Sequence, residues 1–319
     1  MSRKLVKKKL EMDQIYFSSF HKLKFYYLSC FMILGGLFFN TNGFTKEIND
    51  QIYNTSTFKK ITRENLLIDL QAQKIIMLGE VHDNHFQHLI KANLIEELDS
   101  NHSVVSEHIP FQNKVTFTSD LNLSLMNAGF DKEAWSWPVH IELYERLRTL
   151  NKTIIGANLS RDLLISPKQK NQDILIKLSK IVSSCKLDEG ERKKLKSTLF
   201  RSHCNLINEK AVTHMEKAQR LRDAAMAYVA VKNAPSILIA GNSHVRADYG
   251  VSQILNVFFS NISKVSVSFI EISENMIQDS EWEPTTEILL TSSTDYVWFT
   301  PEIEREDPCE SLKYMSETN

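Results

Sequence analysis

The sequence is poor in the residues that mark fibrous, low-complexity or disulfide-rich proteins. Its 319 residues include only nine Gly, seven Pro and four Cys. So few glycines and prolines exclude a collagen-like or low-complexity chain, and no repeat of solenoid length occurs. With 42% hydrophobic and 24% charged residues, the composition is that of a globular protein with a sizeable core.

The chain also lacks an excess of charge of one sign, because its formal net charge is −1. Residues 1–43 contain seven Lys or Arg and two Asp or Glu, which leaves 31 basic and 37 acidic residues in the rest of the chain. That remainder has a net charge of −6 and no basic surplus to contact a phosphate backbone. Nucleic acid is therefore not an expected partner.

The basic N-terminus precedes an uncharged apolar run of 15 residues, Phe25 to Phe39, which small and polar residues follow. This order predicts a signal peptide over residues 1–43 and an exported body. The alternative is an uncleaved anchor, although the run is shorter than the ~20 residues that span a membrane. No later run is long enough, so we expect membrane attachment only through this leader or through a lipid on Cys30.

Three cysteines follow the leader, and their spacing matches no zinc site. In an oxidising compartment Cys185 and Cys204 are well placed to close a helical hairpin with a disulfide. The alternative interpretation is that these cysteines are free buried thiols.

Six short apolar and β-branched runs alternate with helical patterns, at residues 74–80, 102–109, 153–159, 236–245, 264–272 and 295–300. Such alternation predicts an α/β fold with a mainly parallel sheet flanked by helices. The last run is a candidate antiparallel edge strand. Between about 160 and 235 the pattern is purely helical, which predicts an all-helical insertion covering the carboxyl edge of the sheet. Residues 44–319 then form a single domain.

Polar side chains follow the carboxyl ends of four of these strands: Glu80 and His82, Glu107, Asn158, and His244 with Arg246. Ligands of open α/β sheets bind just beyond these strand ends, so we expect a site there. Two of the ends share the form Gly-x-x-His, and glycine allows a sharp turn or a close approach.

The residue types at these strand ends allow more than one chemistry. Glu80 or Glu107 can orient an imidazole, accept a proton or bind a hard cation, while His82 and His244 can bind a transition metal or an anionic group. The guanidinium of Arg246 suits a carboxylate.

Several other residues allow two interpretations each. His85 and His88 follow His82 at three-residue spacing, which is compatible with a three-histidine metal cluster but favours a solvated first turn of a helix. Arg222 interrupts the apolar stripe of residues 208–232, where it needs an acceptor, pairs with Asp223 or reaches solvent. The aromatic residues around Trp135 can line a pocket for a flat ligand or pack in the core; His140, His203 and His214 have no assigned role.

The motifs of several large enzyme classes are absent. The sequence contains no GxSxG, P-loop, HExxH or GxGxxG motif, which excludes the usual serine hydrolases and the usual nucleotide-phosphate and dinucleotide-binding proteins.

The motifs IIMLGEVHDNHFQHLI, VVSEHIPF, SWPVHIELY, IIGANLSRD, KAQRLRDAAMA, AGNSHVRADYGVSQIL and DYVWFTP, in this order over residues 62–300, resemble the ChaN family. This haem-binding, iron-regulated lipoprotein family belongs to a superfamily with TIKI proteases and erythromycin esterases. The resemblance implies an α/β fold with helical additions, a bacterial envelope location in the periplasm or at the outer membrane, haem binding and a homodimer. The leader departs from the family's lipoproteins because it contains no convincing lipobox.

The resemblance carries functional roles onto the matching positions, which are Glu80, His82, Asp83, Asn84, Glu107, Asn158, Gln219, Arg222, Asp223, His244, Arg246 and Tyr249. Ferric haem accepts a phenolate or an imidazole as axial ligand, and its propionates need donors. On this basis Tyr249 or Tyr144 is a candidate iron ligand, and His82, His244 or Arg246 would hold the propionates.

Two functions follow from the same strand ends. The first is haem binding for iron uptake, which the closer sequence match favours. The alternative is a TIKI-type or esterase-type hydrolase in which Glu80, His82, Glu107 and His244 hold a divalent metal or activate water. A purely structural envelope protein would leave the two Gly-x-x-His strand ends unexplained.

Overall fold

The computed structural model describes residues 50–98, 101–165, 172–279, 281–307 and 309–310. The predicted signal peptide and Cys30 lie outside these residues. Within the described residues, none of the helices has the length and apolar character needed to cross a membrane.

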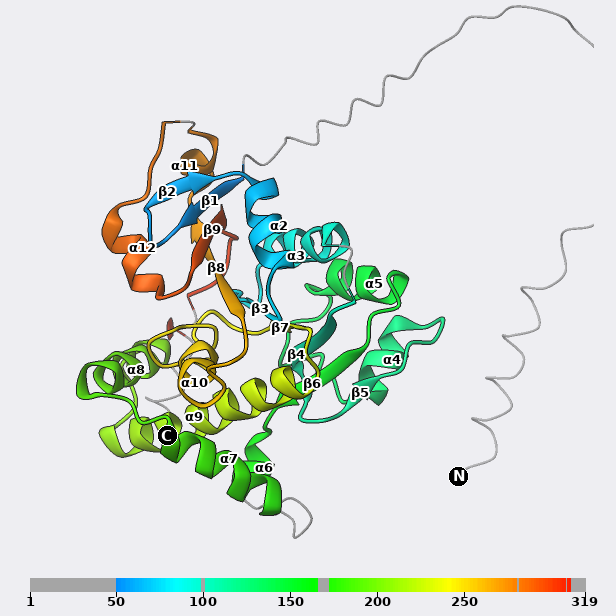
Figure 1. Cartoon of the computed structure of the whole chain (residues 1–319), viewed down its shortest axis with the longest axis vertical. Coiled ribbons are helices and arrows are strands. Elements are labelled where there is room, and N and C mark those ends of the chain that lie inside the picture. The colour runs from blue at the N-terminus through cyan, green and yellow to red at the C-terminus, as the bar shows by residue number, and fades with distance from the viewer. Residues whose placement is uncertain (1–49, 99–100, 166–171, 280, 308, 311–319) are drawn as a thin grey trace, which may run out of the picture. The chain divides into compact units, whose positions relative to one another are not determined.

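A nine-stranded sheet runs through the described residues in the order β2-β1-β9-β8-β3-β7-β4-β6-β5 (Figure 1). The strands are β1 Gln51–Asn54, β2 Lys59–Ile61, β3 Ile75–Leu78, β4 Ser103–Pro110, β5 Lys114–Val115, β6 Ile154–Asn158, β7 Ser236–Ile239, β8 Lys264–Ile272 and β9 Tyr296–Pro301. The six from β9 to β6 in this order are mutually parallel, and β1, β2 and β5 are antiparallel additions at the two ends. All six predicted strands are present, and the mainly parallel α/β fold is confirmed.

The last strand, β9, differs from the expectation of an antiparallel edge. It runs parallel to β8, with Val267 opposite Tyr296, and its other side is covered by β1, with Gln51 opposite Phe299. The edge prediction was wrong because the first two strands, only four and three residues long, were too short to recognise in the sequence.

Helices cover both faces of the sheet (Figure 1). They are α2 Arg63–Gln71, α3 His85–Glu97, α4 Leu121–Asn127, α5 Ile141–Thr149, α6 Arg161–Ile165, α7 Gln172–Ser184, α8 Glu189–Ser202, α9 Glu209–Lys232, α10 Val251–Phe258, α11 Glu274–Gln278 and α12 Thr286–Ser292. Alternate residues of the central strands divide between two cores, with Ile76 and Leu78 in one and Ile75 and Met77 in the other. This double coverage explains why β3 and β7 are apolar throughout.

The predicted helical insertion contains α6 to α9. The longest helix, α9, begins at its cap Asn208, whose side chain accepts from the backbone N–H of Ala211. Its small residues, including Ala224 and Ala227, pack on the sheet. Before these residues on the same helix, Gln219 and Asp223 reach the residues beyond the carboxyl end of β7.

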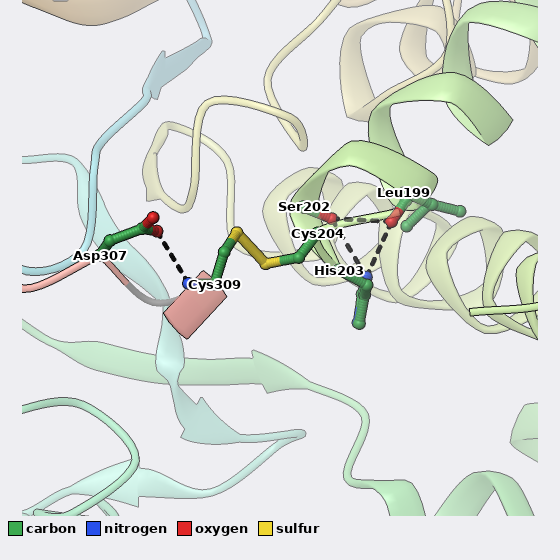
Figure 2. The surroundings of a disulfide bond; sticks show 6 residues. All are labelled: Leu199, Ser202, His203, Cys204, Asp307 and Cys309. Atoms are coloured by element: carbon green, nitrogen blue, oxygen red, sulfur yellow. Dashed lines mark hydrogen bonds between the residues drawn. A yellow bond between two sulfur atoms is a disulfide. The ribbon is translucent and has the colours of Figure 1, made fainter. Parts of the chain in front are cut away.

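The disulfide expected between Cys185 and Cys204 is absent, and Cys204 is bonded to Cys309 (Figure 2). Cys185 is a buried free thiol in the core that α7 and α9 share. Its backbone carbonyl accepts from Arg220, so this residue packs toward α9. Cys204 follows α8 and faces the C-terminal segment, which the spacing of the cysteines could not reveal.

The same C-terminal segment carries Arg305, whose guanidinium bonds to two carboxylates. It contacts both oxygens of Asp83, just after β3, and both oxygens of Glu271 near the end of β8. The segment beyond β9 is thus fastened at two points, by this ion pair and by the disulfide.

Loss of the disulfide should destabilise the fold strongly because it joins positions 105 residues apart. The chain-entropy argument gives about 3 to 5 kcal/mol for a loop of this size. We expect Cys204→Ser and Cys309→Ser to lower the free energy of unfolding in urea by that amount, with Cys185→Ala as the control. A non-reduced peptide map that joins Cys185 to Cys204 would contradict the assignment.

Candidate active site at the strand ends

The carboxyl ends of three adjacent strands, β3, β7 and β4, bring the site residues together. Because β7 lies between the other two, Glu80 after β3 and Glu107 in β4 flank the turn that follows β7. The backbone N–H of Gly241 donates to Oε2 of Glu107 at 2.8 Å. A Cβ at Gly241 would lie 2.9 Å from Nε2 of His82, so glycine is needed for the close approach of that ring.

Glu80 is the centre of the network. Its carboxylate is fully buried and contacts the ammonium of Lys91 through Oε2. Oε1 lies 2.6 Å from Nε2 of His108 and 2.8 Å from Nδ1 of His82. Since a carboxylate only accepts, both imidazole nitrogens must carry protons. Burial alone would raise the pKa of Glu80, but Lys91 and His108 hold it well below its usual range.

A second buried group surrounds His244. Its Nδ1 lies 2.6 Å from Oδ1 of Asp223, its Nε2 lies 3.2 Å from Oε1 of Glu107, and the amide of Gln219 contacts the ring. Burial would lower the pKa of His244, but the two carboxylates raise it to about 10. His244 is therefore an imidazolium at neutral pH, with no lone pair to offer a metal.

His82 links the two groups and also reaches the surface. Its Nδ1 bonds to Glu80, and its Nε2 lies 3.9 Å from Oε2 of Glu107. The side chain is 41% exposed, whereas those of Glu80 and Glu107 are 0% and 8% exposed. The half-buried ring of Trp135 lies edge-on to it, with the centroids 5.0 Å apart.

Four buried residues of this network were not assigned a role from the sequence: His88, Lys91, His108 and His140. His88 and Lys91 belong to α3, and His140 directly precedes α5 without a capping hydrogen bond from its side chain. The burial of Lys91 could have been predicted from the sequence, because this lysine falls on the apolar face of α3 together with Leu94 and Ile95.

The predicted solvated turn at the start of α3 is only half right. His85 is exposed, but His88 is fully buried and its Nε2 donates to the backbone carbonyl of His82 at 2.8 Å. Burial and the nearby Lys91 lower the pKa of His88 to about 3, so it is neutral.

The two tyrosines considered as iron ligands do not present their hydroxyl groups at the surface. Tyr144 is 1% exposed and bonds to Ser106 and to Nδ1 of His108 at 3.0 Å. Burial raises its pKa. Tyr249 is also 1% exposed, and its hydroxyl contacts Thr198 at 3.4 Å. Tyr249 also lines a surface pocket together with Thr198 and Arg246.

Three further candidates lie outside the network. The guanidinium of Arg246 is held by both oxygens of Asp248 and by the carbonyl of Thr291. Arg222 donates to the carbonyl of Leu159 rather than to Asp223. The backbone of Asn158 accepts from Phe111, and no polar contact of its side chain with the network is seen among the described residues.

Asp83 and Asn84 lie in the turn between β3 and α3. Asp83 is ion-paired with Arg305, and Asn84 caps α3 while donating to Glu271 at 2.6 Å. Both side chains therefore connect the turn after β3 to the end of β8.

The four residues that the hydrolase interpretation assigns to a metal do not bring their ligand atoms close enough together to share one ion. Among the described residues, only Glu80, His108 and His140 place three potential ligand atoms within 4.8 Å of one another. The set of Glu80, His82, Glu107 and His244 does not meet this limit, and His244 is already held by two carboxylates.

The comparisons with known proteins agree with this architecture. Residues 66–255, more than half of the chain, match the family model described as haem-binding uptake, Tiki superfamily, ChaN. This chain belongs to the ChaN family. Among curated proteins, none matches it in sequence.

Two solved structures are similar to this chain to different degrees. The Campylobacter jejuni protein described as "Cofacial heme binding to ChaN" is 21% identical, with a TM-score of 0.56 over 78% of this chain and 96% of that one. A Bacillus cereus protein is 12% identical, with a TM-score of 0.43 over 75% of this chain and 90% of that one. The first similarity confirms the fold of this ChaN-family chain.

The raised pKa of His244 makes its contribution to stability depend on pH. Because the folded-state pKa of about 10 exceeds the ordinary 6.5, the ion pairs stabilise the fold fully below about pH 6.5 and less as the pH rises towards 10. We expect His244→Gln to lose about 3 to 5 kcal/mol at pH 6 and less at pH 10. Urea unfolding across this pH range, with His203→Gln as control, measures the difference; a loss that does not change with pH contradicts the assignment.

Proposed function

We propose that this chain binds haem at the surface formed by His82 and Trp135, and that it serves haem or iron uptake. The observation that carries the proposal is the state of His82. Its Nδ1 is held by a buried carboxylate while the side chain is 41% exposed, the arrangement of an imidazole prepared to bind a metal through Nε2. Bound haem would supply an iron centre with an open axial position for this nitrogen.

Trp135 favours a flat ligand at this place. Its ring packs edge-on against both His82 and His108, with centroid distances of 5.0 and 4.9 Å. A half-exposed indole beside a half-exposed imidazole offers an apolar and a ligating group to the same planar molecule.

The neighbouring carboxylates affect the pH range of binding. Burial would lower the pKa of His82, but the hydrogen bond that its ring donates to Glu80 and the charge of Glu107 raise that pKa above its ordinary value. A proton and the iron compete for Nε2, so affinity for haem should fall as the solution becomes acidic.

Replacement of His82 should remove the axial ligand. We expect His82→Ala to weaken haemin binding at least about tenfold, or about 1.4 kcal/mol, and to change the ferric Soret spectrum. The measurement is a haemin titration followed by absorbance at several pH values. His85→Ala, which alters an exposed histidine outside the network, is the matched control.

Equal affinity and an equal spectrum in wild type and His82→Ala would refute this ligand assignment. Retained affinity in His82→Ala with a loss in Tyr249→Phe would instead return the role to the tyrosine.

The hydrolase interpretation predicts a different result in the same protein. It requires a stoichiometric divalent metal that is lost in His82→Ala together with turnover of a substrate. Purified protein that takes up haemin in a one-to-one ratio and needs no such metal would support the binding function.

We also propose export to the cell envelope and a homodimer formed around haem. Export is supported by the leader pattern and by the Cys204–Cys309 disulfide, since such bonds persist in oxidising compartments. The cofacial haem of the Campylobacter relative and the exposure of His82 support a second copy facing the first. Light scattering with and without haemin should show a doubled mass only with haemin; an unchanged mass contradicts the dimer.

A further inference from the structure

Glu80 and the histidines around it are the residue types of a metal site, but a lysine, Lys91, contacts the same carboxylate. Carboxylates and imidazoles are ordinary ligands of zinc and related metals. Glu80, His108 and His140 place their ligand atoms within 4.8 Å of one another, and all three are buried. Neither ring nitrogen of His140 has a hydrogen-bond partner, although its side chain has no exposed surface. Buried polar atoms without partners are rare and need an explanation.

His88 directs another unpartnered nitrogen to the same carboxylate. Its Nε2 donates to a backbone carbonyl, so its Nδ1 carries a lone pair. That Nδ1 has no hydrogen-bond partner and lies 3.7 Å from Oε2 of Glu80. A lone pair and a carboxylate oxygen that face each other repel unless a cation lies near both.

Lys91 supplies that cation. Its ammonium contacts Oε2 of Glu80, and its side chain has no exposed surface. It lies three residues after His88 on α3, so the two side chains approach the same oxygen from one side of the helix. An ionised carboxylate at this depth is strongly unfavourable unless it is paired.

We propose that the ammonium of Lys91 takes the place of a metal ion in a carboxylate–histidine ligand set, and that it positions Glu80 to hold Nδ1 of His82. Lys91 acts through Glu80, so it is a positioning residue. The statement about His82 rests on the proposed haem site, whereas the statement about the ligand set stands without it.

The proposal predicts that removal of the ammonium creates a metal site. Lys91→Met keeps most of the side-chain volume but leaves Glu80 unpaired among imidazole nitrogens. We expect the full chain with Lys91→Met, after treatment with a chelator, to bind Co²⁺ at least about tenfold more tightly than wild type, with the visible absorption of a low-symmetry cobalt site. The double variant Lys91→Met/His140→Ala should lose this gain.

A control variant separates binding at this site from general effects of losing a lysine. Lys210→Met alters an exposed lysine at the start of α9 and should leave Co²⁺ binding as in wild type. Wild type that binds one Co²⁺ as tightly as Lys91→Met, or a Lys91→Met protein whose binding is unaffected by His140→Ala, would overturn the proposal.

A failure of Lys91→Met to fold would also be informative. The variant Glu80→Gln/Lys91→Met removes both charges, so it should fold and bind no Co²⁺. If Lys91→Met folds only in the presence of Co²⁺, the metal replaces the ammonium as proposed. If Co²⁺ does not restore it while the double variant folds, the proposal is wrong.

The link to His82 has a separate readout. Without Lys91 and with no metal bound, the buried carboxyl group of Glu80 takes up a proton. Nδ1 of His82 then loses a charged acceptor that increases the electron donation of Nε2 to iron. We expect the reduction potential of bound haem to rise in Lys91→Met, measured without added cobalt, relative to Lys210→Met. An unchanged potential refutes the positioning of His82. If wild type binds no haemin, only the haem function fails, and the cobalt result still decides the role of Lys91.

Discussion

A fully buried carboxylate, that of Glu80, sets the requirements for the residues around it. The charge cannot be solvated, so it needs a cation and hydrogen-bond donors from several parts of the chain. Lys91 comes from α3, His108 from β4 and His82 from the turn after β3. One acidic side chain therefore joins a strand, a turn and a helix, and it orients the half-exposed imidazole of His82.

The neighbouring group around His244 has the reverse arrangement of charges. There an imidazolium, that of His244, lies between Glu107 and Asp223, so the positive charge is central and the carboxylates surround it. The two groups meet at His82, whose Nε2 lies 3.9 Å from Glu107. In both groups the buried charges are paired with one another, whereas the side chain of His82 is 41% exposed beside the ring of Trp135.

The parallel sheet explains which parts of this site the sequence could predict. Strands of one direction end at one edge, so Glu80, Glu107 and His244 were correctly expected to lie together. The residues that complete the network come from elements whose position depends on tertiary packing. His140 precedes α5 and Lys91 lies in the middle of α3, and no strand-end rule includes them.

Other features of the structure depend on which way a side chain packs, which the sequence does not show. Tyr249 follows the second Gly-x-x-His turn closely, but it turns inward beneath the guanidinium of Arg246, 4.7 Å from the ring centroid. The partner of Cys204 lies 105 residues away, beyond any local pattern. Connectivity of this kind cannot be read from cysteine spacing.

The place of β9 in the sheet has a consequence for the order in which the chain can fold. This strand separates β1 from β8, so the first two strands have no route into the main sheet except through the last one. In whatever compartment the chain folds, β1 and β2 therefore stay apart from the main sheet until β9 has paired with β8. The parallel strands that end at the site can pair earlier, because none of their contacts with one another needs the first two strands.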